Sequence, residues 1–464
     1  MEIGEGTGTP ADIAAGDVDQ CNLIGFRRRF YDCLDRWGDA LFELCDAVLC
    51  SPTPVGSVPS LSLEPVFRRS HGSLYKALAN GTIDADRFRE LLVEARPQHW
   101  PAVFAIDAST WDRCDAETSP ERGFYFSASK HSNGQPIVAG WSYQWITQLG
   151  WAPDSWTAPM DARRITPHED AVTVTIEQIE RLVDLLAVGD RATTPMFVFD
   201  AGYDPVALTV GLADTRAQIL VRISPKRVFH PDPTPRTPNT TGRPRRHGQR
   251  FVLSDPTTWT TPDQTLTTND PRYGTINVRS RAAMHPKLHG RGRWASDQGL
   301  PPIVPATIIR VEVEHLPKPT SNTTKTLWLW WSGPGQPDLD VCWRAYLRRF
   351  DIEHTFRFIK NTLGWTTPSV CTPEQADRWT WLTVAAYTQL RLARNVIDDR
   401  RRPWERPKQP HQLSPARIRR GFRQLRPHLA TPAHPPKSIK PGPGRPKGTR
   451  KPPRTLHPPI KKAA

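Results

Sequence analysis

The first hundred residues carry apolar side chains at helical spacing. From Phe26 to Leu49, apolar residues recur every three or four positions, which predicts a helix. A break rich in Pro and Ser follows at 51–65, and helical spacing returns at 87–94. We therefore expect residues 1–98 to form a helical region, which either packs on the next domain or contacts phosphate through its basic side chains.

Short apolar runs replace this pattern after Pro101. Ala102–Ile106 is one such run and stops at Asp107, and Met196–Phe199 is another and stops at Asp200. Each run predicts a buried strand that ends on an acid. Strands are also predicted at 123–129, 136–146 and 218–223, and helices at 168–188 and 204–214. This order of elements predicts a mixed α/β sheet.

The region 225–325 interrupts this order. It is rich in Pro, Thr, Arg and Gly, and its strand-like pieces are 250–253, 275–279 and 308–313. We therefore predict a β-rich insertion. Its basic loops, 242–250 and 287–293, either contact nucleic acid or are ordinary solvated loops, and their composition fits both interpretations equally.

After the insertion, the pattern predicts one strand and three helices. They lie at 326–331, 340–363, 373–394 and 415–425. Residues 431–464 combine Pro with Lys and Arg and carry no acid, a composition typical of disorder. The predicted organisation is a helical region (1–98), a core in two parts (99–224 and 326–399) around the insertion (225–325), and a basic tail (400–464).

Positive charge is concentrated at one end of the chain. The formal net charge is +15, and residues 400–464 hold 19 of the 62 Lys and Arg residues with one acid, Glu405. The rest of the chain is therefore close to neutral. A basic tail on a neutral body fits a polyanionic partner such as nucleic acid, or serves as a solubilising tail.

Composition excludes several classes of protein. Apolar residues make up 38% of the chain and include 17 Trp, which is enough for a core and excludes wholesale disorder. The sequence has no run of about 18 apolar residues that would predict a transmembrane helix, and its acidic N-terminus lacks the apolar segment of a secretory signal. The seven cysteines form no Cys-x-x-Cys pair and are interpreted as free thiols in a reducing compartment.

The helix predicted directly after the last strand carries a polar stripe. At about 100° per residue, Tyr346, Arg349, Glu353 and Lys360 fall within an arc of roughly 60°, and Arg357 extends the same face. The other faces are apolar, so the stripe borders a cleft or a partner. Two interpretations stay open. The carboxylate holds Mg²⁺ and the cations hold phosphates, or Arg349, Glu353 and Lys360 form an internal ion-pair ladder.

Three carboxylates fit a single metal-dependent site. Asp107 and Asp200 come from two predicted strand ends, and Glu353 comes from this helix. Three such carboxylates can hold two Mg²⁺ ions about 4 Å apart, which activate water or a 3′-OH and stabilise the leaving oxygen of a phosphodiester. The chain has no G-x-x-x-x-G-K-[ST] phosphate loop, so we expect no nucleotide cofactor.

The order of these acids resembles that of a known family. Asp107, Asp200 and Glu353 on an α/β pattern resemble the RNase H-like catalytic domain of DDE transposases from bacterial insertion sequences. The long region before Glu353, with its strand-like pieces, is similar to the β-rich insertion of one large branch of that family. The resemblance covers roughly residues 100–395.

Two motifs carry the resemblance to this branch. The segment Tyr346-x2-Arg349-x3-Glu353-x6-Lys360 matches its Tyr-Arg-Glu-Lys signature at all four positions. The segment Asp-Ala-Gly-Tyr-Asp at 200–204 is similar to the segment around its second Asp.

The resemblance implies roles for individual residues. The three acids of the DDE order would be catalytic and would ligate two Mg²⁺ ions, with Mn²⁺ as a substitute. Tyr346, Arg349 and Lys360 would contact phosphates at the transposon end. We add Arg357 to these DNA contacts and Asp204 as a further candidate for the site.

The tail carries a smaller resemblance. Residues 443–448, Pro-Gly-Arg-Pro-Lys-Gly, resemble the core of an AT-hook, in which an extended Arg-Pro segment lies in the minor groove. This resemblance adds Arg445 and Lys447 as candidate DNA contacts. The alternative is nonspecific phosphate binding by the tail.

The function implied is that of a DNA transposase in the bacterial cytoplasm, associated with the nucleoid. It would bind the terminal inverted repeats of its element as a homodimer, cut the ends and join the 3′-OH groups to target DNA. Two alternatives stay open: an RNase H-like nuclease that cleaves without joining strands, and a non-catalytic DNA-binding protein derived from a transposase. A third is a structural scaffold whose polar stripe is only an ion-pair ladder.

Overall fold

The computed structural model divides the chain into two compact units. It describes residues 10–126, 136–189, 193–235, 242–290, 292–295, 299–317 and 324–437. The first unit falls within residues 1–99, 108–169 and 351–464, and the second within 100–107 and 170–350. Strand β1 (Val103–Asp112) passes from the second unit into the first after Asp107.

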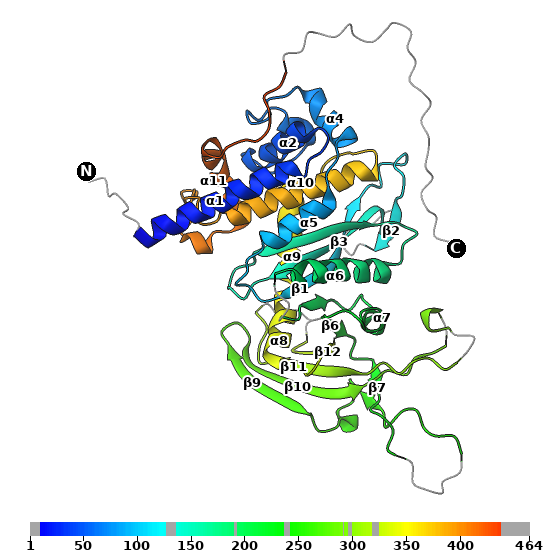
Figure 1. Cartoon of the computed structure of the whole chain (residues 1–464). Coiled ribbons are helices and arrows are strands. Elements are labelled where there is room, and N and C mark those ends of the chain that lie inside the picture. Colours follow the sequence, from blue (N-terminus) through cyan, green and yellow to red (C-terminus); the bar gives the residue numbers. More distant parts are fainter. Residues whose placement is uncertain are drawn as a thin grey trace. The chain divides into compact units, whose positions relative to one another are not determined.

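Helices make up most of the first unit (Figure 1). They are α1 (Pro10–Asp32), α2 (Gly38–Cys50), α3 (Val58–Leu61), α4 (His71–Asn80), α5 (Ala85–Glu94), α9 (Asp351–Asn361), α10 (Pro373–Leu392) and α11 (Pro415–Leu425). Helix α10 is their common partner, because it contacts α1, α2, α4, α11 and a strand of the same unit. Residues 379–390 of α10 are buried on every face, as expected of a helix inside a core.

Besides the second half of β1, the first unit holds an antiparallel arrangement around one long strand. Its strands are β2 (Gly123–Phe126), β3 (Ile137–Leu149) and β4 (Thr157–Ile165). Strand β3 pairs with β2 through residues 137–140 and with β4 through residues 142–149. Helices α5, α9 and α10 contact β4, so the helices of this unit cover its strands.

The second unit is built on a mixed sheet. In it, the first half of β1 pairs in parallel with β5 (Met196–Phe199), which pairs in parallel with β6 (Gln218–Ile223). The antiparallel strands β12 (Thr326–Ser332), β11 (Ala306–Val313), β10 (Gly274–Met284) and β9 (Gln264–Asp270) follow in that order. The strands of the predicted β-rich insertion therefore extend the core sheet.

Helices flank this sheet in the described part of the second unit. They are α6 (Ala171–Ala187), α7 (Pro205–Gly211) and α8 (Leu339–Arg348). The unit also contains a short antiparallel ribbon of β7 (Val228–Phe229) and β8 (Phe251–Val252). Helix α7 contacts β6 and α6, and α8 contacts β5, β9 and β10. A large mixed sheet with flanking helices confirms the predicted α/β class and is consistent with an RNase H-like fold.

Several predicted elements match the structure closely, and strands β4, β7 and β9 were missed. The predictions at 218–223 and 415–425 coincide with β6 and α11. Strand β4 was not predicted, because Pro159 and charged residues interrupt its apolar pattern. The pairing with β3 shifts at Pro159, so the missing N–H falls in a bulge. Asp161 is neutralised by Arg89, whose Nε lies 2.8 Å from its Oδ1.

Two stretches predicted as single helices are each two helices. The first breaks between α1 and α2, where Trp37 adopts a left-handed conformation with φ of 59°. The carbonyls of Cys33 and Arg36 there accept hydrogen bonds from the amides of Asp84 and Thr82 in place of helical ones. The second, predicted at 340–363, breaks between α8 and α9 at residues 349–350. Hydrophobic period does not record these breaks, because the helices on both sides still bury apolar faces.

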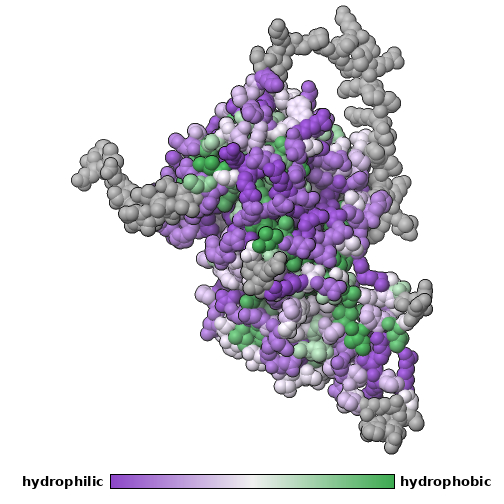
Figure 2. Space-filling view, in the orientation of Figure 1, coloured by the Kyte–Doolittle hydropathy of each residue, from purple (hydrophilic) through white to green (hydrophobic). Residues whose placement is uncertain are grey.

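The face shown in Figure 2 is largely hydrophilic, with small apolar areas between. Within the part of the chain that the structure describes, no helix combines the length and apolarity that spanning a membrane requires.

Trp365 stands at the centre of the aromatic core of the first unit. Its ring centroid lies 5.1 Å from that of Trp145, 5.5 Å from Tyr143 and 6.0 Å from Trp111. Its Nε1 donates a 2.8 Å hydrogen bond to the hydroxyl of Thr380. This core joins the strands to the segment that follows α9.

We predict that Trp365→Ala lowers the free energy of unfolding by about 3–5 kcal/mol, since it leaves a large cavity in the aromatic core and removes the hydrogen bond to Thr380. Chemical denaturation of the full chain measures this change. The control is Trp404→Ala, whose side chain is 75% exposed and whose loss should cost less than about 0.5 kcal/mol. Equal effects of the two substitutions would contradict the packing described.

Candidate active site

Asp107 and Asp200 are brought together by the register of two parallel strands. In the second unit, Ala105 of β1 is the partner of Val198 of β5. Two residues further along each strand, the same register leads to Asp107 and Asp200. Because side chains alternate between the faces of a sheet, both carboxylates point to the same side as Ala105 and Val198.

The two acids differ in their place on the strands. Strand β5 ends at Phe199, directly before Asp200, as predicted. The prediction that β1 ends at Asp107 is wrong, because β1 continues to Asp112. The apolar run marks only the fully buried half of β1, and burial alternates after Asp107, which is the pattern of a half-buried strand.

Tyr346 of α8 and Arg349, the C-cap residue of this helix, contact this pair of carboxylates. Nη1 of Arg349 donates a 3.1 Å hydrogen bond to Oδ2 of Asp107, and its Nη2 lies 3.6 Å from Oδ2 of Asp200. The hydroxyl of Tyr346 donates to Oδ1 of Asp200 at 3.4 Å. The Arg349 side chain is 10% exposed and that of Asp200 is 42% exposed, so the cluster opens to solvent on the Asp200 side.

Two phenols beside the cluster remain protonated. Burial raises the pKa of Tyr203, and the negative charge of Asp107 raises it further. Burial also raises the pKa of Tyr346. Arg222 lowers this pKa by a smaller amount, through its positive charge and a hydrogen bond to the Tyr346 hydroxyl. Both tyrosines can therefore donate hydrogen bonds at neutral pH.

Sequence reasoning did not assign roles to Tyr203 and Arg222. Tyr203 lies in the Asp-Ala-Gly-Tyr-Asp segment at 200–204, so the sequence motif already contained it. Arg222 lies on β6, and no motif marks it. Only the packing of α8 over the sheet brings it to Tyr346.

Glu353, Arg357 and Lys360 belong to the first unit, on α9. Glu353 lies in the first turn, where a negative charge is favoured by the helix dipole, and is half-buried. Nζ of Lys360, in the last turn, lies 5.5 Å from the ring centroid of Trp365. Arg357 is exposed.

The predicted polar stripe needs correction. It was derived for one continuous helix, and the interruption between α8 and α9 removes the common axis from which its angles were taken. The alternative ladder is also not formed. Arg349 pairs with Asp107 and Asp200, and Glu353 makes no ion pair within the described residues.

The carboxylate pair has the chemistry of a cation site. Asp107 and Asp200 offer hard oxygen ligands of the kind that Mg²⁺ and Mn²⁺ prefer. The guanidinium between them shows that this position favours positive charge. Among the described residues, no group of three or more His, Cys, Asp or Glu side chains is arranged to hold a metal ion. Glu353 as a third ligand therefore stays a prediction.

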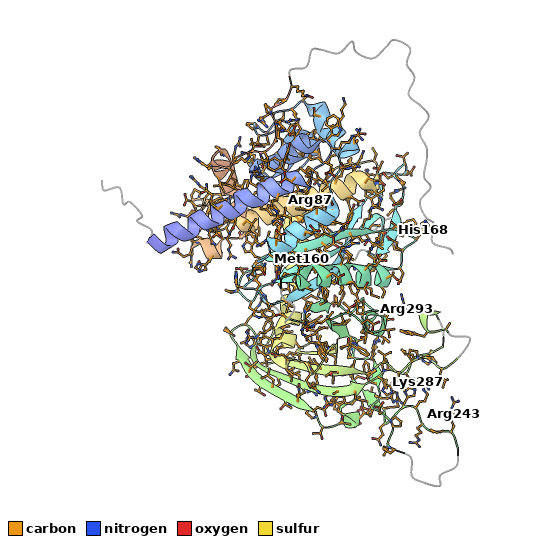
Figure 3. The ribbon with its side chains drawn as sticks, viewed as in Figure 1. Arg87, Met160, His168, Arg243, Lys287 and Arg293 are labelled. Atoms are coloured by element: carbon orange, nitrogen blue, oxygen red, sulfur yellow. The ribbon has the colours of Figure 1, made fainter. Side chains whose placement is uncertain are left out.

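Basic residues outside this cluster were also candidates. Arg445 and Lys447 lie outside the described residues. Arg243, Lys287 and Arg293 lie on the side of the second unit away from β9 (Figure 3). Arg293 forms an ion pair with Asp170, the N-cap of α6, at 2.5 Å, so one of the two basic loops is tied to its own unit.

Asp204 has a structural role. Its Oδ1 accepts hydrogen bonds from the amides of Val206 and Ala207, at 3.0 and 3.3 Å, and so caps α7. The N-cap position, followed by Pro205, explains an acid at this point without any part in metal binding.

We predict that Asp204→Ala lowers the free energy of unfolding by about 1 kcal/mol, because two amides at the start of α7 lose their acceptor. Asp204→Asn keeps a capping oxygen and should cost only a few tenths of that value. Urea titration of both variants measures the difference. If the Asn variant were as unstable as the Ala variant, the negative charge of Asp204 would be required and the capping role would be wrong.

Comparison with protein families places this geometry in context. The family model described as DDE superfamily endonuclease matches residues 29–285, more than half of the chain. The match contains Asp107 and Asp200 and ends before Tyr346, Arg349 and Glu353. No curated protein matches the chain. The carboxylate pair predicted from the sequence thus lies inside the matched region, and the chain belongs to the family of DDE superfamily endonucleases.

Proposed function

We propose that this endonuclease is the transposase of a mobile DNA element. It cuts DNA at the ends of the element and joins the freed 3′-OH ends to target DNA. The observation that carries the proposal is the in-register pair of Asp107 and Asp200, contacted by both Tyr346 and Arg349 of α8. These two residues of α8 also begin the Tyr-Arg-Glu-Lys signature, whose second half lies on α9.

DDE endonuclease domains generally use divalent metal ions, and we propose two Mg²⁺ ions, replaceable by Mn²⁺. Such ions activate the attacking oxygen and neutralise charge on the leaving oxygen. Asp107 and Asp200 fit this role by their carboxylate chemistry and their shared position, and we assign Glu353 as the third acid. Arg349 and Lys360 bind phosphate oxygens of the DNA, Arg349 through two parallel hydrogen bonds.

Two reactions follow in the proposed sequence. In the first, the oxygen of water bonds to the phosphorus at the element end, the bond from phosphorus to the 3′-oxygen breaks, and that oxygen takes a proton. In the second, the oxygen of the resulting 3′-OH loses its proton and bonds to a phosphorus of target DNA, the bond from that phosphorus to its 3′-oxygen breaks, and the displaced 3′-oxygen takes up a proton. One phosphodiester replaces another in the second step, so no nucleotide is consumed.

The proposed partners are the terminal inverted repeats of the element and the target DNA. Tyr346 and Arg357 complete the contacts to phosphate at the repeat. Arg445 and Lys447 in the basic tail add sequence-independent contacts. We propose that the chain acts as a homodimer on DNA, at the nucleoid of a bacterial cell.

A nuclease that cleaves without joining strands is the second candidate. The family is described as an endonuclease, and this description fits a nuclease as well as it fits a transposase. The two differ in their products, since only a transposase converts a cut 3′-OH end into a new phosphodiester with target DNA.

We predict that Asp107→Asn, Asp200→Asn and Glu353→Gln each lower DNA cleavage by at least about 100-fold, because each removes a negative ligand from the site. The substrate is a plasmid that carries the DNA flanking the coding gene of the chain, incubated with Mg²⁺ or Mn²⁺. Asp214→Asn, at an exposed position of the unit that holds Asp107 and Asp200, is the matched control and should cleave normally.

DNA affinity of the same variants distinguishes the alternatives. Affinity should stay within a few-fold of the unmodified chain. Cleavage that survives loss of these acids would overturn the proposed site, and cut ends that never join a second plasmid would favour the nuclease.

We also predict that Arg357→Ala and Lys360→Ala weaken DNA binding and each lower the slope of log K against log salt by about 1, because each removes one phosphate contact. Fluorescence anisotropy between 50 and 200 mM salt would measure the slope. The matched control is Arg272→Ala, since Arg272 lies on the turn between β9 and β10 and is exposed. An unchanged slope for Arg357 or Lys360 would remove that residue from the DNA contacts.

A further inference from the structure

Arg349 already occupies the position that a metal ion needs. Its guanidinium lies between the carboxylates of Asp107 and Asp200, 3.1 and 3.6 Å from their Oδ2 atoms. The side chain is 10% exposed, so this cation is largely shielded from water. Two adjacent carboxylates repel one another, and the guanidinium offsets that repulsion.

A guanidinium and a divalent cation cannot both bind these oxygens. The guanidinium faces the Oδ2 atoms of both carboxylates, and its positive charge repels a cation that approaches the same two atoms. Arginine does not lose its proton in proteins, so Arg349 cannot be neutralised in place. A divalent cation can therefore bind between the two Oδ2 atoms only if the side chain of Arg349 moves away.

The place of Arg349 in the chain permits such a movement. It is the C-cap of α8 and lies in the two-residue interruption before α9, not inside a helix. Its side chain therefore starts from a helix end, where neighbouring turns leave more room than in a helix interior. A phosphate group is a suitable acceptor, because it takes the same paired hydrogen bonds as a carboxylate.

We propose that Arg349 is an internal counter-ion that keeps Asp107 and Asp200 from binding metal until a DNA phosphate takes its guanidinium. The inference rests on the proposed function, because it requires a DNA substrate at this site. It makes metal binding and DNA binding cooperative. By reciprocity, DNA raises metal affinity by the same factor by which metal raises DNA affinity.

Calorimetric titration of the full chain with MnCl₂ in the absence of DNA tests this inference without measuring activity. We expect Arg349→Gln to bind Mn²⁺ about tenfold more tightly than the unmodified chain, a factor typical of coupled sites. The matched control is Arg344→Gln, which removes one positive charge from the same helix. Arg344 forms an ion pair with Asp340 at 2.8 Å, away from the two acids. Arg344→Gln should therefore leave the Mn²⁺ affinity within twofold of that of the unmodified chain.

Two further titrations locate the effect. Asp107→Asn combined with Arg349→Gln should lose the gain, which places the ion on the carboxylate pair. A short duplex of any sequence should raise the Mn²⁺ affinity of the unmodified chain and leave that of Arg349→Gln unchanged. If Arg349→Gln does not fold, Arg349→Lys serves instead, since a single ammonium cannot bridge both acids as the guanidinium does.

The outcomes separate the two proposals. Equal or weaker Mn²⁺ binding by Arg349→Gln would overturn the counter-ion role, even if Asp107→Asn abolishes cleavage. Tighter binding by Arg349→Gln, together with cleavage that survives Asp107→Asn, would support the counter-ion role and overturn the proposed active site.

Discussion

In the second unit, the pairing of β1 with β5 holds Phe104 against Phe197, with ring centroids 5.5 Å apart. This register sets the positions of Asp107 and Asp200, which follow on the two strands. Phe104 and Phe197 lie on the face of the sheet opposite to the acids, because side chains alternate. A slip of one residue would turn an acid into the core and a Phe toward solvent. Burial of the aromatic pair therefore positions the carboxylates of Asp107 and Asp200.

The charge of this carboxylate pair explains much of its surroundings. Two negative groups side by side need compensation, and α8 brings both a guanidinium and a phenol to them from one end of a single helix. Tyr203 adds a second protonated phenol, kept neutral by burial. Tyr346 and Arg349 stabilise the two acids and are also the residues expected to bind a DNA phosphate. The same side chains therefore serve a structural and a functional role. This coincidence is the basis of the counter-ion proposed for Arg349.

The first unit gives α9 a rigid support. Trp365 follows α9 directly and packs among Trp111, Tyr143 and Trp145, while Lys360 lies against the Trp365 ring. Helix α10 is buried on all sides through most of its length. A functional side chain needs neighbours whose own positions are fixed by packing, and this core provides one for Lys360.

The sequence by itself determined the α/β class, the apolar strands that lead to Asp107 and Asp200, and the elements whose period and boundaries agree, such as β6 and α11. These features depend on local pattern, which a single chain segment contains. The end of β1, the interruption at Arg349 and the contacts of Arg222 were decided only by tertiary structure. Each depends on which distant backbone or side chain takes a hydrogen bond or an ion pair, and no periodicity records such partners.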